Sequence, residues 1–180
     1  MNRKGFTLIE LLAVIILVAL IGVLVIPSVI DTAKQTKQKA YDILIENIGT
    51  AAKTYFEECE YGNLSELDYE GAKACTINGD NSIETTLGTL ANLGFLPTKE
   101  TYEDSNKRKV SNPIDNQDIS NCQIKITKTK TPTTIEDSKI TTVKVTYTLS
   151  IDQDALDKSK CPSAEDLKKD LEKVVIKWYN

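Results

Sequence analysis

Apolar residues fill the chain from Phe6 to Ile30 almost without interruption, and polar and charged residues dominate from Asp31 onward. This run of 25 residues is long enough, as a helix, to cross a hydrocarbon core of about 30 Å. Gly22 and Pro27 interrupt it, and because proline removes a backbone donor we expect a kink or a looser helix near residues 23–27. The pattern predicts a membrane-spanning helix.

The flanks of the run predict its orientation. Arg3 and Lys4 precede it and Asp31 follows it, so the positive-inside rule places the N-terminus in the cytoplasm and the rest of the chain outside. A cleaved secretory signal has a shorter apolar core, about 7–15 residues, followed by a small-x-small site. The longer run here favours an anchor.

The helix is predicted to continue to about Glu60, with Gly62 as the first strong stop. Its second half has apolar residues at steps of three and four, which is typical of a helix with one buried face. We expect the first half to pack among neighbours and the second half to pack on the chain's own domain. The residues of the buried face are Tyr41, Leu44, Ile45, Ile48, Ala52, Tyr55 and Cys59.

Short elements and turns follow this helix. Residues 61–82 are rich in glycine and asparagine and predict a loop, and residues 98–121 are polar and irregular. Between them, the segment SIETTLGTLANLGFLP predicts a short helix that ends before Pro97.

Two segments alternate apolar and polar residues with a period of two, which predicts a β-hairpin with one buried face. They are residues 122–127 and 143–152, and residues 128–140 are expected to form a long Thr/Lys loop between them. The last segment, from Ser163 to Trp178, has a capping-box-like start and apolar residues on one helical face, so it predicts a C-terminal helix on the sheet. The fold class is α+β: a long N-terminal helix packed on a small antiparallel sheet, with a C-terminal helix.

The composition argues against several classes of function. The net charge is −4, and Lys125, Lys128 and Lys130 lie among threonines, as on the solvated face of a strand, so no nucleic-acid partner is expected. There is no histidine, which removes the commonest general base and most catalytic zinc sites. Acid pairs such as Glu57 and Glu58 are expected to be solvated, so we predict no enzyme activity and no cofactor.

Metal binding is not expected either. Asp115, Asn116 and Asp118 are oxygen donors of the kind that calcium prefers, but their spacing does not match an EF-hand loop. We interpret this segment as a turn-rich loop.

The chain has four dispersed cysteines, Cys59, Cys75, Cys122 and Cys161, with no C-x-x-C pair. Behind a membrane segment they indicate disulfides outside the cytoplasm rather than a metal site, although buried free thiols remain an alternative. Four cysteines allow three pairings. Cys59 lies on the buried helix face, so a bond to Cys75 would fasten the helix to the domain.

Glu10 is the one ionisable residue between Lys4 and Asp31. A carboxylate inside a membrane costs a few kcal/mol and normally faces a partner. Lys4 is six residues away, out of step with the positions that meet on one helix face. Glu10 therefore either snorkels to the interface or pairs with a cation that another molecule or a processing step supplies.

The segment RKGFTLIELL, residues 3–12, resembles the class III signal of type IV prepilins and type II secretion pseudopilins. These proteins have a short basic leader, a glycine, a phenylalanine, and a glutamate four residues after the phenylalanine. The resemblance covers residues 3 to about 30, including Pro27, and beyond that only the layout is similar.

The resemblance implies that a prepilin peptidase cuts between Gly5 and Phe6, that the new Phe6 amine is N-methylated, and that Glu10 pairs with the Phe6 amine of a neighbouring subunit. It implies a leader (residues 1–5), an assembly helix (6–30), its amphipathic continuation (31–60) and an extracytoplasmic domain (61–180). It also implies partners: other pilin copies, the peptidase and an assembly platform in the membrane. A Cys122–Cys161 bond would match the disulfide-bounded region of many pilins by layout.

Three functions remain open at this point. The leading hypothesis is a subunit of a type IV pilus or pilus-like filament, which starts in the cytoplasmic membrane and ends at the cell surface. The second is a pseudopilin of a type II secretion or DNA-uptake system. The third is a permanently anchored extracellular binding protein, in which Glu10 would have no role in assembly.

Overall fold

The computed structural model describes residues 7–66, 75–98, 108–134, 141–151, 161–162 and 164–179. Contacts divide the chain into two compact units, Met1–Ala40 and Tyr41–Asn180. One helix, α1, contributes residues to both.

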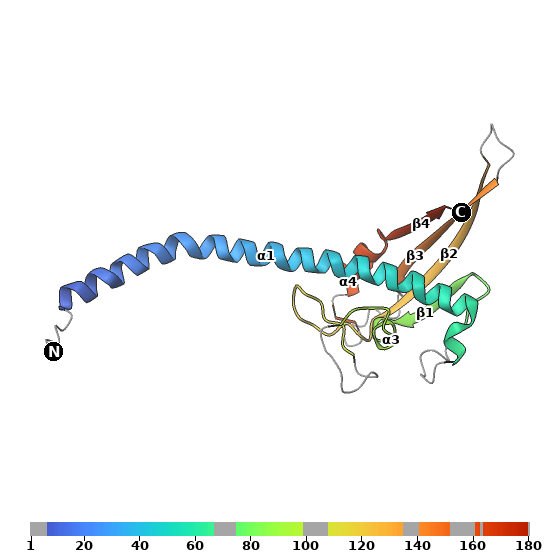
Figure 1. Cartoon of the computed structure of the whole chain (residues 1–180), viewed down its shortest axis with the longest axis horizontal. Coiled ribbons are helices and arrows are strands. Elements are labelled where there is room, and N and C mark those ends of the chain that lie inside the picture. Colours follow the sequence, from blue (N-terminus) through green and yellow to red (C-terminus); the bar gives the residue numbers. More distant parts are fainter. Residues whose placement is uncertain are drawn as a thin grey trace, which may run out of the picture. The chain divides into compact units, whose positions relative to one another are not determined.

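Helix α1 covers Leu8–Tyr61, 54 residues (Figure 1). The predicted continuation to about residue 60 is confirmed. The helix is assigned without a break through Gly22 and Pro27, so the kink near residues 23–27 remains a prediction. Gly62 follows with a φ of +77°, a conformation that glycine adopts without the Cβ clash of other residues, and its N–H donates to the Cys59 carbonyl at 3.2 Å.

In the first unit the described apolar side chains of α1 are largely exposed. Leu8 is 82% exposed, Ile9 74% and Val23 72%. By length and composition, α1 is the helix of the described residues that could cross a membrane. A helix that is apolar on all sides is stable only when lipid or other protein chains cover it.

The second unit contains an antiparallel sheet with the strand order β1-β2-β3-β4 (Figure 1). The strands are β1 (Ser82–Thr86), β2 (Gln123–Thr134), β3 (Thr141–Ile151) and β4 (Val175–Tyr179). Ile126 lies opposite Leu149 on one side and Ile83 on the other. The predicted hairpin is therefore confirmed and forms the centre of the sheet.

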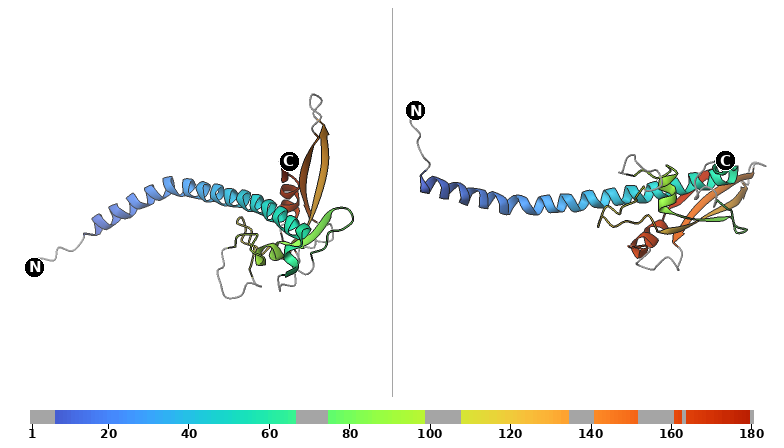
Figure 2. Two further views of the ribbon diagram at one scale, coloured as in Figure 1. Left: turned by 45° about the vertical axis from the view of Figure 1, so that its right-hand side comes forward. Right: turned by 90° about the horizontal axis from the view of Figure 1, so that it is seen from below.

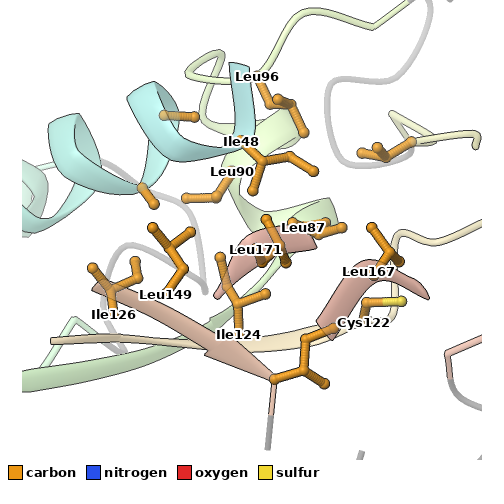
Figure 3. Packing of buried hydrophobic residues seen from close by; sticks show 14 of the residues in the cluster. Ile48, Leu87, Leu90, Leu96, Cys122, Ile124, Ile126, Leu149, Leu167 and Leu171 are labelled. Atoms are coloured by element: carbon orange, nitrogen blue, oxygen red, sulfur yellow. The ribbon is translucent and has the colours of Figure 1, made fainter. Parts of the chain in front are cut away.

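The core forms where the helices cover one face of this sheet (Figure 3). Helix α1 contributes its predicted face, with Tyr41, Ile48 and Tyr55 at 3%, 0% and 1% exposure. The short helices α3 (Leu87–Asn92) and α4 (Ala164–Leu171) add Leu90 and Leu167. The architecture is the expected α+β class, with a short 3-10 turn at Asn63–Glu66 after α1.

The predicted helix at SIETTLGTLANLGFLP is wrong for its first five residues. Ser82–Thr86 form strand β1, and helix α3 covers only Leu87–Asn92. Thr86 separates the two elements: its extended backbone ends the strand and its Oγ1 accepts from the Thr89 N–H at 3.1 Å, which caps the helix. The free edge of β2 gives the β-branched segment a partner that sequence reasoning did not foresee.

The predicted Thr/Lys loop at residues 128–140 is also wrong for the segment 128–134, while residues 135–140 lie outside the described residues. Strand β2 runs to Thr134 and β3 begins at Thr141, with Pro132 opposite Val143. Threonine favours extended backbone, and each residue of the segment gains a ladder partner in β3. The distal part of this hairpin extends past the short strands β1 and β4 (Figure 2).

The C-terminal helix ends earlier than predicted. Helix α4 stops at Leu171, and Val175–Tyr179 form strand β4, which pairs with Lys144–Thr148 of β3. The segment is β-branched and aromatic, and the open edge of β3 satisfies its backbone groups. The predicted cap residue Ser163 lies outside the described residues.

Gly49 allows this last segment to approach α1 closely. A Cβ at position 49 would lie 2.6 Å from Val174 Cγ1 and 3.4 Å from Ile176 Cδ1. We expect Gly49→Ala to lower the free energy of unfolding by about 1–2 kcal/mol, because overpacking outweighs the helix propensity of about 1 kcal/mol that alanine adds. Urea unfolding of the full chain in detergent micelles, followed by circular dichroism, measures this.

The matched control is Gly79→Ala, since a Cβ at Gly79 has nothing within 4 Å. We expect this variant to unfold at the wild-type urea concentration. A Gly49→Ala protein more stable than wild type would contradict the close packing.

Candidate functional site

The first turn of α1 is closed by a reciprocal pair of hydrogen bonds between Thr7 and Glu10. The Thr7 backbone N–H and the Thr7 Oγ1 both donate to Glu10 Oε2 at 2.9 Å. In return, the Glu10 N–H donates to the Thr7 carbonyl at 3.1 Å, with Thr7 Oγ1 3.4 Å away. This is a capping box, which satisfies backbone donors that a helix start otherwise leaves unpaired.

Thr7 is therefore a site residue that our sequence analysis missed. The signal was present in the chain as T-L-I-E, residues 7–10, which is the T-x-x-E spacing of a capping box. This spacing places the carboxylate of Glu10 in the first turn of α1. At that position its charge is also favourable toward the helix dipole.

The capping box holds the Glu10 carboxylate at the N-terminal end of the helix, but it supplies no positive charge. The nearest cations in the sequence are Arg3 and Lys4, before the apolar run. Gly5 and Phe6, where we expect cleavage and methylation, lie outside the described residues. The pairing of Glu10 with a Phe6 amine therefore remains a prediction.

A second polar cluster fastens the end of α1 to the sheet. Lys128, on β2, has a side chain only 9% exposed, and its ammonium contacts Glu60 Oε2. The same ammonium lies 5.6 Å from the Phe56 ring centre and 5.7 Å from that of Tyr147, both suitable for cation–π attraction. We call these four residues, with Glu57, the Lys128 cluster.

Our prediction of a solvated lysine face is wrong for Lys128. Lys125 pairs with Asp80 at 2.9 Å near the surface and Lys130 is 57% exposed, but Lys128 shares the face of β2 on which Ile124 and Ile126 are buried. The period of two already placed it there. Its length lets the ammonium reach Glu60 at the edge of the core.

Glu57 completes the cluster from the helix. It accepts a hydrogen bond from the Tyr147 hydroxyl at 3.1 Å and pairs with Lys53 at 3.4 Å, so it is not simply solvated as we expected. Burial, with the nearby Glu57 carboxylate, raises the pKa of Tyr147 far above its usual range. Tyr147 therefore remains a neutral hydrogen-bond donor that ties β3 to α1.

Two disulfides fasten the ends of the core. Cys59, in the last turn of α1, is bonded to Cys75, with Cα atoms 5.8 Å apart. Cys122, before β2, is bonded to Cys161, with Cα atoms 4.7 Å apart. The first links α1 to the loop that follows it, and the second links the sheet to the segment before α4.

In the loop with the candidate calcium ligands, the aspartate carboxylates accept hydrogen bonds from backbone N–H groups of the same loop. Asp115 Oδ1 accepts from the Gln117 N–H at 3.1 Å, and Asp118 Oδ1 accepts from the Ser120 N–H at 2.9 Å. These contacts are typical of Asx turns. In the part of the chain that the structure describes, no group of three acidic, histidine or cysteine residues is placed to hold a metal.

The N-terminal segment of the chain matches a known family. Residues 1–26 match the family described as "Prokaryotic N-terminal methylation motif", the class III signal peptide of type IV pilins and pseudopilins. The chain matches no curated protein and no solved structure at a significant level. The match supports a pilin-type or pseudopilin-type structural protein rather than an enzyme, and it includes Thr7 and Glu10.

Proposed function

We propose that this chain, which carries the N-terminal methylation motif, is a subunit of a type IV pilus or pilus-like filament that polymerises through α1. The observation that carries the proposal is Glu10, a carboxylate held at the first turn of α1, in the otherwise apolar run of residues 6–30. Within the apolar run it has no cation partner. Such a group calls for a partner from outside the run.

The missing cation is created by processing. Cleavage between Gly5 and Phe6 gives Phe6 a positively charged amine and removes Arg3 and Lys4, so the mature chain has 22 − 2 = 20 basic against 26 acidic side chains. The new amine lies at the positive end of the α1 dipole, where a cation is disfavoured unless a carboxylate offsets it. A neighbouring copy supplies that carboxylate as Glu10.

The capping box supports this role. Thr7 stays in the mature chain, so cleavage after Gly5 leaves the donors to Glu10 Oε2 in place. The carboxylate is therefore oriented before the neighbour arrives, and less conformational entropy is lost when the pair forms. In a low-dielectric surrounding both charges are penalised when unpaired, so the pair favours one register between subunits.

Assembly of this kind assigns a role to each part of the chain. Residues 1–5 form the leader, 6–30 the membrane and assembly helix, 31–60 its amphipathic continuation and 61–180 the extracytoplasmic domain. The chain spans the cytoplasmic membrane once, with the N-terminus inside, until the assembly platform extracts it into the filament. Its partners are the prepilin peptidase and other pilins.

The same motif occurs in pseudopilins, so a subunit of a type II secretion or DNA-uptake system is the alternative. Both proteins undergo the same processing, and the Thr7–Glu10 pair serves both. They differ in whether the filament extends from the cell or stays in the envelope, which electron microscopy of the surface distinguishes.

The direct test is the mature N-terminus. We expect mass spectrometry of the membrane-bound chain, co-expressed with a prepilin peptidase, to find a chain that begins at N-methylated Phe6. Without the peptidase it should begin at Met1. Replacing Gly5 should block cleavage, and a chain that keeps Met1 in the presence of active peptidase would contradict both pilin and pseudopilin functions.

A further inference from the structure

The second unit has a groove beside α1 that the core leaves open. Its volume is about 500 Å³. The wall formed by α1 consists of Asp42, Ile45, Glu46, Thr50 and Lys53, and the opposite wall is the segment 174–176. Along α1, the carboxylates of Asp42 and Glu46 lie toward the start of the groove and Lys53 toward its end. Between them, the side chains of Val174 and Ile176 approach the helix at Gly49. Val175 in the opposite wall is still 43% exposed.

Ile43 is the exposed apolar side chain on the same stretch of helix. It is 58% exposed, while Tyr41 and Ile45 on either side of it are buried. In residues 31–60, all of which the structure describes, it is the only large hydrophobic side chain that is mainly exposed. A single exposed apolar residue is common on protein surfaces, so Ile43 becomes informative only through its register with the groove.

The register comes from the proposed function, on which this inference rests. If the Phe6 amine of one copy meets Glu10 of the next, parallel helices are offset by four residues, roughly 6 Å along the axis. Because α1 is assigned as one helix from Leu8 to Tyr61, we carry the same offset along it to the second unit. Each residue is then level with the residue four positions later in the neighbour, so Ile43 is level with Asn47, at the middle of the groove wall.

Charges along the two surfaces match in this register. Lys39 is four residues before Ile43, so the two share one side of the helix. At the four-residue offset, Lys39 lies level with the neighbour's Asp42–Glu46 turn. The positive charge before Ile43 therefore meets the acidic end of the neighbour's groove.

We propose that Ile43 of one copy inserts into the groove between α1 and the segment 174–176 of the next copy in the filament. The occupant is a second copy of this chain. The contact is heterologous, because a protruding residue on one copy meets a groove on the next, and each copy keeps one of the two for a further neighbour. Contacts of this kind propagate as open helical assemblies.

The first test compares two aspartate substitutions. Ile43→Asp places a carboxylate in the apolar part of the groove and near its acidic end, and we expect about tenfold fewer filaments in the sheared fraction. Peptidase processing, membrane level and thermal unfolding should match those of wild type. The control is Ile114→Asp, at a position 43% exposed in the loop at residues 108–121, which should leave filament yield unchanged.

The second test is a cross-link between full-length copies. Cells that co-express Ile43→Cys and Val175→Cys chains should give an oxidant-dependent dimer in isolated filaments, and cells with either variant alone should give little. A strong dimer from Ile43→Cys alone would overturn the inference, because Ile43 would then face its own equivalent. Ile43→Asp filaments as abundant as wild type would overturn it as well. Failure of wild type to form filaments would instead overturn the proposed function, and this inference with it.

Discussion

Glu10→Gln is expected to reduce filament yield by roughly 100-fold or more, while the mutant chain is still folded and inserted in the membrane. Glutamine keeps the size and the hydrogen-bonding oxygen of the side chain but removes its charge. The Phe6 amine of the neighbour is then left unpaired in a low-dielectric surrounding. Removing one partner of a buried ion pair costs about 3–5 kcal/mol, which corresponds to two or more factors of ten in an equilibrium constant.

Filament yield is measured by immunoblotting the sheared and membrane fractions of the same cells. Cleavage after Gly5 should continue, since the cleaved bond precedes the substituted residue. A Glu10→Gln strain with wild-type filament yield would remove Glu10 from its assigned role.

Thr7→Ala separates assembly from capping. This variant loses the hydroxyl that bonds to Glu10 Oε2 at 2.9 Å but keeps the carboxylate charge and the backbone N–H donor. Loss of a cap side chain costs about 1 kcal/mol, so we expect a loss of filaments of less than about tenfold. If Thr7→Ala were as defective as Glu10→Gln, Glu10 would act chiefly through its own helix rather than through a neighbour.

Glu60→Gln is expected to lower the free energy of unfolding of the second unit by about 2 kcal/mol. Lys128, whose side chain is only 9% exposed, would lose its closest carboxylate. Lys130, which lies 3.9 Å from Glu60, is itself a cation and cannot offset the positive charge of Lys128. Glu60 itself is 33% exposed, so water reduces the penalty below that of a fully buried pair. Urea unfolding in micelles under non-reducing conditions measures the change.

Lys128→Met tests the physical reason for that loss. Methionine fills most of the same volume beside Phe56 and Tyr147 without a charge, so we expect a smaller loss, about 1 kcal/mol. The double variant Lys128→Met, Glu60→Gln should be no less stable than Glu60→Gln alone. A Glu84→Gln control, at an exposed position of β1, should change nothing. If Lys128→Met were the more damaging single variant, the contact would stabilise the fold through cation–π attraction rather than charge pairing.

Several elements were wrongly predicted for one common reason. The segments 82–86 and 175–179 each became a strand because a free strand edge was available, at β2 and at β3 respectively. The segment 128–134 extended β2 because the opposite strand was long enough to pair with it. Backbone partners far away in the sequence decided these cases, and local propensity was too weak to do so.

The sequence by itself determined the features with a strong local period or motif. These are the long helix, the central hairpin, the buried face of residues 41–59 and the processing motif around Glu10. Each depends on spacing within a few turns of chain, which the residue order fixes directly.

The tertiary structure alone decided which distant groups meet. Burial of Lys128 against Phe56 and Tyr147 and the approach of Val174 to Gly49 both join segments that the sequence leaves unordered in space. Of the three possible cysteine pairings, the structure has Cys59–Cys75 and Cys122–Cys161, the two bonds that the sequence analysis favoured. Such contacts depend on how helices and strands pack into one dense core, where each group is satisfied only by partners that the whole fold brings near.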